Sequence, residues 1–207
     1  MNKVNYQKKL DLIIEENLKK GRLPSLFLHA CCAPCSTYCL EYLSRFFDIT
    51  VFYYNPNISP QEEYEKRVGE IKRFITEFPA ENKVKLMLGD YDPKVFFEAA
   101  KGFEAVPEGG ERCFRCFRLR LMKSAEKAAK LGYEYLTTTL TISPLKNAEK
   151  LNEIGEECAE KYSIKWLPSD FKKKNGYKRS IELSREYNLY RQNFCGCVYS
   201  KRESEQE

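Results

Sequence analysis

The stretch Ser25-Leu-Phe-Leu-His-Ala-Cys-Cys-Ala-Pro-Cys35 contains a short apolar run, a pair of adjacent cysteines and a proline. The run over residues 25–30 has the length and composition of a buried strand. Pro34 suits the first turn of a helix, because the N–H that it lacks would have no partner there, and we expect this helix to continue to about Phe47. The stretch therefore predicts a strand, a turn that carries thiols, and a helix.

Apolar, β-branched runs alternate in the same way with amphipathic stretches along the rest of the chain, which is the pattern of βαβ units. No Gly/Ser-rich or Pro-rich linker divides the 207 residues. We predict one α/β domain, a Rossmann-like (HUP-type) parallel sheet covered by helices, with an N-terminal helical part at residues 1–24 and a basic, aromatic part at residues 168–200 that contributes to the site. Strands are expected at residues 49–54, 83–88 and 135–139, and helices at 61–78, 93–101, from Cys113 onward, 145–162 and 180–190.

The first twenty residues carry charges throughout and predict an amphipathic helix rather than a signal peptide. No later apolar run approaches the eighteen or so residues of a membrane span. We therefore expect a cytoplasmic protein, in which thiols stay reduced and paired cysteines are more often ligands or catalytic groups than structural cross-links.

Seven of the nine cysteines fall into three short groups: Cys31-Cys32-Ala-Pro-Cys35, Cys113-Phe-Arg-Cys116 and Cys195-Gly-Cys197. Thiols this close together at turns and helix starts can converge on one metal ion or cluster. The odd total argues against a closed disulfide framework. The spacing predicts a metal-thiolate redox site and fits zinc and iron-sulfur equally well, whereas Cys39 and Cys158 are expected to pack in the core.

The Cys195-Gly-Cys197 group allows a second interpretation, because two thiols separated by one flexible residue can close a strained disulfide. Strained disulfides are easily reduced, which suits an electron relay. Both cysteines could instead be metal ligands. The residues leave the choice open.

Unusual residues follow three of the predicted strands, where ligands bind in open parallel sheets. The cysteine turn follows the first strand, Asn55-Pro-Asn57 follows the second, and a run of hydroxyls at residues 137–143 follows the fourth. These hydroxyls can cap a helix or hold an anion. His29, the single histidine, is expected to be a hydrogen-bonded core residue.

The net charge of +5 is concentrated between residues 171 and 191, which contain seven Lys or Arg against two Glu. Basic residues mixed with aromatic ones offer phosphate contacts and stacking surfaces to RNA. We expect phosphate contacts from Lys173, Lys178 and Arg179; the alternative is a solvated helix face with its rings turned to the core. The aromatic residues are Phe171, Tyr177, Tyr187 and Tyr190.

Six motifs occur in order between about residues 26 and 200: His29-Ala-Cys-Cys-Ala-Pro-Cys35, Tyr54-Asn-Pro-Asn-Ile58, Gly110-Glu-Arg-Cys-Phe-Arg-Cys-Phe-Arg-Leu119, Thr137-Thr-Thr-Leu140 with Ser143-Pro144, Asp170-Phe-Lys-Lys173 with Gly176-Tyr-Lys-Arg-Ser180, and Tyr190-Arg-Gln-Asn-Phe-Cys-Gly-Cys197. Together they resemble the QueH family of epoxyqueuosine reductases. The resemblance implies removal of the epoxide oxygen from epoxyqueuosine in the anticodon loop of tRNA, with two electrons, to give queuosine and water. This is the last step of queuosine biosynthesis.

The resemblance also implies an iron-sulfur enzyme and so favours a [4Fe-4S] cluster over zinc. Carried over to this sequence, the implied cluster ligands are Cys31, Cys32, Cys113 and Cys116, with Cys195 and Cys197 as a redox-active catalytic pair. Cys35 could replace Cys31 or hold an additional iron. Because a cluster delivers electrons singly, the second electron would come from the 195/197 dithiol or from that iron. The resemblance also implies an electron donor, which the sequence does not identify.

Three alternatives come from other functional classes. A zinc-stabilised RNA-binding module would explain the cysteines and the basic charge without chemistry. A thiol-disulfide oxidoreductase could use Cys32 and Cys35, but it would leave the other two cysteine groups without a role. A nucleotide-dependent tRNA-modifying enzyme would need a phosphate-binding Gly/Ser loop after the first strand, where this chain has cysteines.

Overall fold

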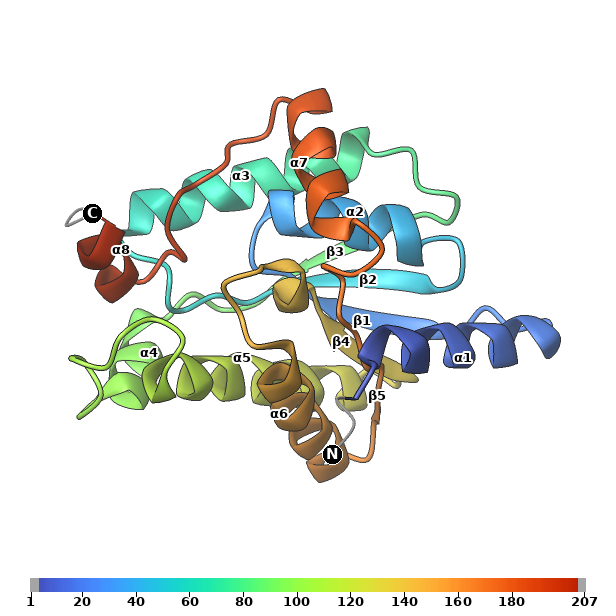
Figure 1. Ribbon diagram of the computed structural model, residues 1–207, viewed down its shortest axis with the longest axis horizontal. Coiled ribbons are helices and arrows are strands. Elements are labelled where there is room, and N and C mark those ends of the chain that lie inside the picture. The colour runs from blue at the N-terminus through green and yellow to red at the C-terminus, as the bar shows by residue number, and fades with distance from the viewer. Residues whose placement is uncertain (1–3, 205–207) are drawn as a thin grey trace.

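The computed structural model describes residues 4–204, which form a five-stranded parallel sheet flanked by helices (Figure 1). The strand order is β3-β2-β1-β4-β5. This order confirms the predicted α/β class and the Rossmann-like sheet. The strands are β1 (Ser25–His29), β2 (Asp48–Tyr53), β3 (Lys85–Leu88), β4 (Tyr135–Thr138) and β5 (Lys165–Trp166).

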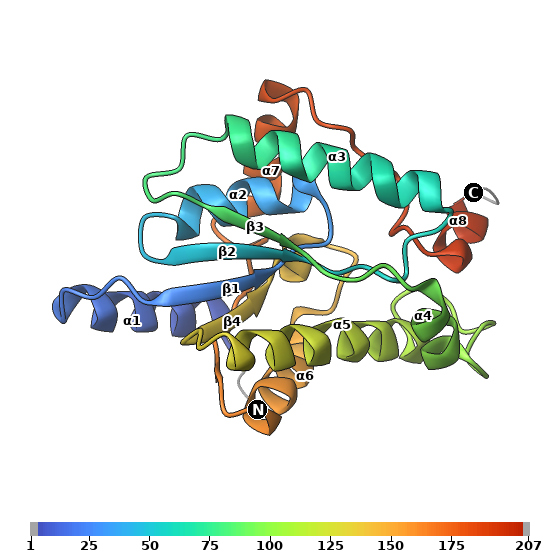
Figure 2. The same ribbon diagram turned by 180° about the vertical axis from the view of Figure 1, so that it is seen from behind.

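Helices cover both faces of the sheet, as Figures 1 and 2 show from opposite sides. One layer contains α2 (Ala33–Leu43), α3 (Gln61–Glu77) and α7 (Gly176–Glu186), and the other contains α5 (Glu111–Lys130) and α6 (Ala148–Lys161). The N-terminal α1 (Tyr6–Lys19) joins the first layer through Leu10 and Ile14. The short helices α4 (Pro93–Ala100) and α8 (Val198–Ser204) lie beyond the carboxyl ends of the strands.

Alternate residues of each strand enter opposite cores, because successive side chains of a strand point to opposite faces. Leu26 and Leu28 of β1 pack in the cluster beneath α2 and α3, whereas Phe27 packs in the cluster beneath α5 and α6. The Phe27 and Phe52 rings stack with centroids 5.0 Å apart. Both faces of β1 are therefore buried, as the continuous apolar run predicted.

Three features of the C-terminal part were not predicted. The two-residue strand β5 is too short to leave a periodic pattern, and α8 was missed. The predicted helix at residues 180–190 begins earlier, at Gly176, and ends at Glu186. Its end is set by Asn188, whose φ of 46° is left-handed and cannot continue a helix.

Among the described residues, no helix is both long enough and apolar enough to cross a membrane.

The packing of α6 on β5 depends on a glycine. A Cβ atom at Gly155 would lie 2.3 Å from Cζ2 of Trp166. The indole cannot easily move away, because it is 8% exposed and its Nε1 donates a 3.0 Å hydrogen bond to Asn152 Oδ1. Gly155 therefore allows the close contact between α6 and the edge strand.

We predict that Gly155→Ala lowers the free energy of unfolding by about 1–3 kcal/mol, the usual cost of overpacking. Gly69→Ala is the matched control, because Gly69 is also inside a helix but has no atom within 4 Å of its added Cβ. Alanine there should raise stability by up to about 1 kcal/mol through helix propensity. Urea denaturation of both variants measures the difference, and equal stabilities would contradict the proposed contact.

Candidate metal centre

The cysteine turn lies where the sheet changes its direction of winding. β1 pairs with β2 on one side and with β4 on the other. After β1 the chain enters α2 on one face, and after β4 it passes through a short 3-10 helix, η1 (Thr139–Ile142), and enters α6 on the opposite face. The two diverging connections leave a crevice at the carboxyl ends of β1 and β4, which is the usual ligand site of such sheets.

Three thiols meet in this crevice. The Sγ atoms of Cys31, Cys32 and Cys35 all lie within 4.8 Å of one another, and those of Cys31 and Cys32 are 3.8 Å apart. Cys32 is the extended residue that precedes α2, and Cys35 is in the first turn of that helix. The positive end of the helix dipole and the free N–H groups there favour negatively charged sulfur.

The three sulfurs share charge unequally. Hydrogen bonds from Cys32 and then Cys35 hold the pKa of the Cys31 thiol well below its usual value, with smaller contributions from Lys146 and Thr139. The same interaction with Cys31 raises the pKa of Cys32 to about 12 and that of Cys35 well above its usual value. Without a metal, Cys31 is therefore the thiol of this group that loses its proton most readily.

The hydroxyl run after β4 supports this turn. The backbone N–H of Cys31 donates to Thr139 Oγ1 at 3.3 Å, and the same hydroxyl lies 3.6 Å from Cys31 Sγ. Thr138 Oγ1 accepts from the N–H of Leu140 and caps η1, which confirms capping for that residue. Thr138 also bonds His29 Nδ1 at 2.8 Å, so the histidine is the buried, hydrogen-bonded core residue that was predicted.

A second group of thiols comes from α5 and from the segment before α8. Cys113, Cys116, Cys195 and Cys197 line one small pocket together with Arg120. Burial raises the pKa of Cys116 to about 12 and that of Cys197 to about 11. Within residues 4–204, these four do not converge as closely as the first group does, since no three of them lie within the same 4.8 Å range.

The Cys195-Gly-Cys197 segment is held by α3. The Arg67 guanidinium donates a 3.0 Å hydrogen bond to the Cys195 carbonyl, and the N–H of Ser59 donates to the Gly196 carbonyl at 2.9 Å. Gly196 has a φ of +118°, and a Cβ atom there would lie 2.9 Å from Arg67 Nη1. Only glycine fits this contact, which orients the two flanking thiols.

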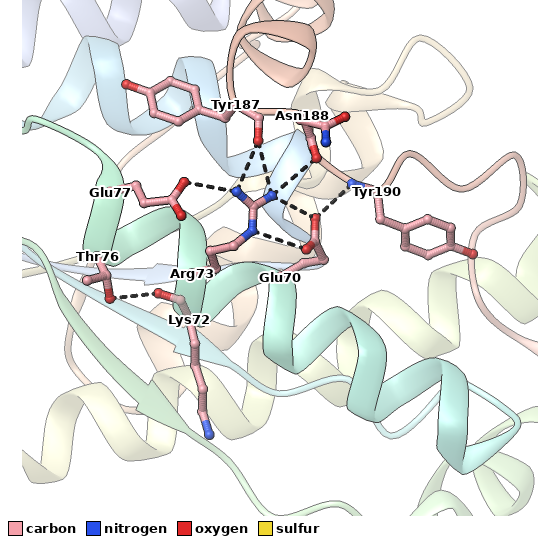
Figure 3. Close-up of polar contacts among 8 residues, drawn as sticks. All are labelled: Glu70, Lys72, Arg73, Thr76, Glu77, Tyr187, Asn188 and Tyr190. Atoms are coloured by element: carbon pink, nitrogen blue, oxygen red, sulfur yellow. Dashed lines mark hydrogen bonds and ion pairs between the residues drawn. The ribbon is translucent and has the colours of Figure 1, made fainter.

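Farther along α3, Arg73 fixes the chain that leads from α7 to this segment (Figure 3). Its guanidinium donates to the carbonyls of Tyr187 and Asn188 at 3.1 and 3.2 Å. Glu70 holds the arginine and also accepts a 2.7 Å hydrogen bond from the N–H of Tyr190. Charged residues on one side of α3 thereby position residues 187–197.

A cavity of about 310 Å³ connects the two thiol groups. Cys31, Cys32, Cys35 and Cys195 all line it, and Cys195 also lines the pocket of the second group. Lys146 and Arg191 border the same cavity. Although burial alone would lower it, the pKa of the Lys146 ammonium is raised by Cys195, Cys31 and Cys35, so the lysine stays charged beside the sulfurs.

The structure therefore divides the predicted site residues into two neighbouring groups. Cys35 belongs to the close group with Cys31 and Cys32, whereas Cys113 and Cys116 lie with Cys195 and Cys197. All nine cysteines are free thiols. Cys39 and Cys158 are fully buried in the apolar clusters, which confirms their predicted packing role.

The basic segment is less available to RNA than its composition suggests. Phe171 is fully buried, and Tyr187 packs edge-on against Phe74. Arg179 already pairs with Glu41, Glu182 and Glu186. Tyr177 and Lys178 are exposed, and Tyr177 lines the cavity.

Sequence reasoning missed the buried arginines that contact the site, Arg67 and Arg120. Each is at most 2% exposed. The available signal was the spacing of Glu63, Arg67, Glu70 and Arg73 at three- and four-residue intervals, which places them along one side of α3. This spacing indicated only a charged helix, because the segment that these residues hold lies more than a hundred positions farther along the sequence.

The charge distribution predicts which thiol reacts first. In reduced, metal-free protein at neutral pH, iodoacetamide should modify Cys31 before Cys113, because a thiolate is the nucleophile. Both side chains are partly exposed, but burial raises the pKa of Cys113 whereas hydrogen bonds lower that of Cys31. Cys32→Ala should slow the labelling of Cys31. Peptide mass spectrometry measures both rates, and faster labelling of Cys113 would contradict the assignment.

Comparison with known proteins agrees with the motifs that surround these thiols. The family model described as "Epoxyqueuosine reductase QueH" matches residues 26–203. The protein of that name from Streptococcus pyogenes serotype M1 is 46% identical over 200 residues, which cover 96% of this chain and 78% of that protein. The one from Staphylococcus epidermidis is 44% identical (96% and 85% covered), and the one from Thermotoga maritima is 36% identical (85% and 90% covered). This chain belongs to the QueH family of epoxyqueuosine reductases.

Proposed function

We propose that this protein is an epoxyqueuosine reductase, which converts epoxyqueuosine in tRNA to queuosine. The reaction breaks both C–O bonds of the epoxide, consumes two electrons and two protons, forms a C=C bond and releases the oxygen as water. The observation that carries the proposal is a cavity lined by four thiols at the crevice of the sheet, in a chain that belongs to this family. Family membership favours the reductase over a zinc module or a thiol-disulfide oxidoreductase.

The close thiol group fits a single metal ion. Four sulfurs arranged tetrahedrally at about 2.3 Å from a metal are about 3.8 Å apart. The Cys31 and Cys32 sulfurs have that separation, and Cys35 lies within 4.8 Å of both. Three thiol ligands leave one position open, as in catalytic rather than structural sites.

The second group fits a larger cofactor. In a [4Fe-4S] cluster each thiolate binds a different iron, so the sulfurs stand farther apart than around one ion. Cys113, Cys116, Cys195 and Cys197 share one pocket without converging closely. We therefore assign these four to a [4Fe-4S] cluster and Cys31, Cys32 and Cys35 to an additional iron. The partition expected from the family resemblance, with Cys31 and Cys32 in the cluster and 195/197 as a dithiol, stays a prediction.

When bound, the cluster would supply single electrons and the additional iron would act as a Lewis acid toward the departing oxygen. The chain contributes charge and shape. Lys146 and Arg191 bring positive charge to the cavity, where negative charge develops as the C–O bond breaks. Thr139 holds the Cys31 backbone, and Arg67 holds that of Cys195, so that the two thiol groups face one cavity.

The two ways of dividing the cysteines between cluster and iron predict different results for serine variants. Under our assignment, Cys195→Ser loses the cluster absorbance, whereas Cys35→Ser keeps it but loses one iron. Both variants should convert epoxyqueuosine in tRNA at least about a hundredfold more slowly than the wild type, which is the usual effect of losing catalytic groups. Cys158→Ala is the control, because this buried cysteine lies in the core away from the cavity.

The assay is anaerobic turnover with a chemical reductant, followed by nucleoside analysis of the tRNA. An intact cluster spectrum in Cys195→Ser would support the dithiol interpretation. Full activity in both variants would contradict the proposed site.

The exposed charges near the cavity should bind tRNA. Lys178 follows the cavity residue Tyr177, Arg191 lines the cavity, and neither forms an ion pair within the described part of the chain. Lys178→Glu combined with Arg191→Glu should weaken tRNA binding. It should also reduce the slope of log affinity against log salt by roughly one unit for each lost phosphate contact.

Lys130→Glu is the control, because Lys130 is exposed at the far end of α5 and should leave the slope unchanged. Filter binding at several salt concentrations measures the slopes. Identical slopes for the double variant and the control would show that this surface does not contact tRNA.

A further inference from the structure

Arg120 is a buried cation in the wall of the second thiol pocket. Its side chain is 1% exposed. Nε donates to the Cys116 carbonyl at 3.2 Å and Nη1 donates to Asn55 Oδ1 at 3.3 Å. Its Nη2 is buried and has no hydrogen-bond partner. The guanidinium therefore has neutral hydrogen-bond partners, and its Nη2 donates to none.

Arg67 shows how the same chain compensates a buried guanidinium elsewhere. It is 2% exposed, and its Nε donates to the carboxylate of Glu63 at 2.6 Å. No carboxylate forms an ion pair with Arg120 within residues 4–204. A buried charge without a counter-ion is costly, because protein surroundings replace the water that would solvate it. An anion beside Arg120 would therefore offset the cost of burying its charge.

Arg120 shares its pocket with the second thiol group. Cys113, Cys116, Cys195 and Cys197 line this pocket with it. Two of these thiols belong to α5 and the other two precede α8, so the arginine borders the second thiol group. Thiols are neutral when protonated, and metal binding is what deprotonates them.

We propose that Arg120 is the counter-cation of the metal-thiolate centre and raises its reduction potential. This inference rests on the proposed metal site. Reduction adds a negative charge to the centre, and a buried positive charge nearby stabilises the reduced form more than the oxidised one. Arg120 acts through the centre and not on the substrate, so it is a positioning residue. Asn55, at the carboxyl end of β2, orients its guanidinium.

The test compares Arg120→Met, which removes the charge, with Arg120→Lys, which keeps it. Both are titrated anaerobically, and the midpoint potential of the cluster is followed by electron paramagnetic resonance. We expect the equilibrium constant for reduction of the cluster to be at least about tenfold smaller in the methionine variant. For a one-electron couple this corresponds to a midpoint potential about 59 mV lower. In the lysine variant this equilibrium constant should stay within about threefold of the wild-type value, because the effect depends on the positive charge and not on the shape of the guanidinium.

Arg118→Met is the matched control. Arg118 lies two residues earlier on α5, is 45% exposed and pairs with Glu157. Its removal should leave the potential unchanged. Should Arg120→Met fail to retain a cluster, Arg120→Gln provides an uncharged side chain that can still donate an N–H to Asn55, and its potential should fall in the same way.

A second measurement separates charge compensation from packing. In metal-free protein, Arg120→Met should unfold at the same or a higher temperature than the wild type, because a buried uncompensated cation is removed. A purely structural arginine would give a lower unfolding temperature. A cluster with unchanged potential in the uncharged variants would overturn the inference and leave the proposed function standing. Wild-type protein without a cluster would overturn the proposed cofactor and the inference with it.

Discussion

The parallel pairing of β1 with β4 is the constraint on which the site depends. These neighbouring strands end together, and the chain then leaves them toward opposite faces of the sheet. The cysteine turn after β1 and Thr139 after β4 are consequently brought side by side, joined by the hydrogen bond from the Cys31 N–H. Each connection would give a solvated loop by itself. Together they form a crevice that brings three thiols within reach of one ion.

Electrostatics explains why the thiol groups and the buried arginines occur together. Arg67 approaches the Cys195 carbonyl with its own carboxylate partner, whereas Arg120 has only neutral hydrogen-bond partners within residues 4–204 and shares its pocket with four thiols. High pKa values keep Cys116 and Cys197 protonated in the absence of metal, so these two thiols do not offset the charge of Arg120. Binding of a metal deprotonates these thiols and supplies the missing negative charge. A metal-thiolate centre in this pocket would therefore offset the charge of Arg120, which the free thiols do not.

Local sequence patterns predicted the strands and helices that surround the site, because β1 and β4 carry apolar runs and Pro34 marks the start of α2. The same patterns separated packing cysteines from clustered ones. They could not predict how seven thiols divide, since that depends on where α5 and the segment before α8 meet in space. The clamp of Arg73 on the Tyr187 and Asn188 carbonyls was equally hidden. Its partners are backbone atoms, which leave no trace in side-chain patterns.

The central claim is that these thiols hold iron and sulfide as a redox centre. The most direct measurement is the iron, acid-labile sulfide and zinc content of wild-type protein purified without oxygen. Our assignment predicts about four sulfides and about five irons per chain, one more iron than a lone [4Fe-4S] cluster contains. One zinc ion per chain without sulfide would contradict it, because zinc is not redox-active and the site would then lack the iron-sulfur centre that our assignment requires.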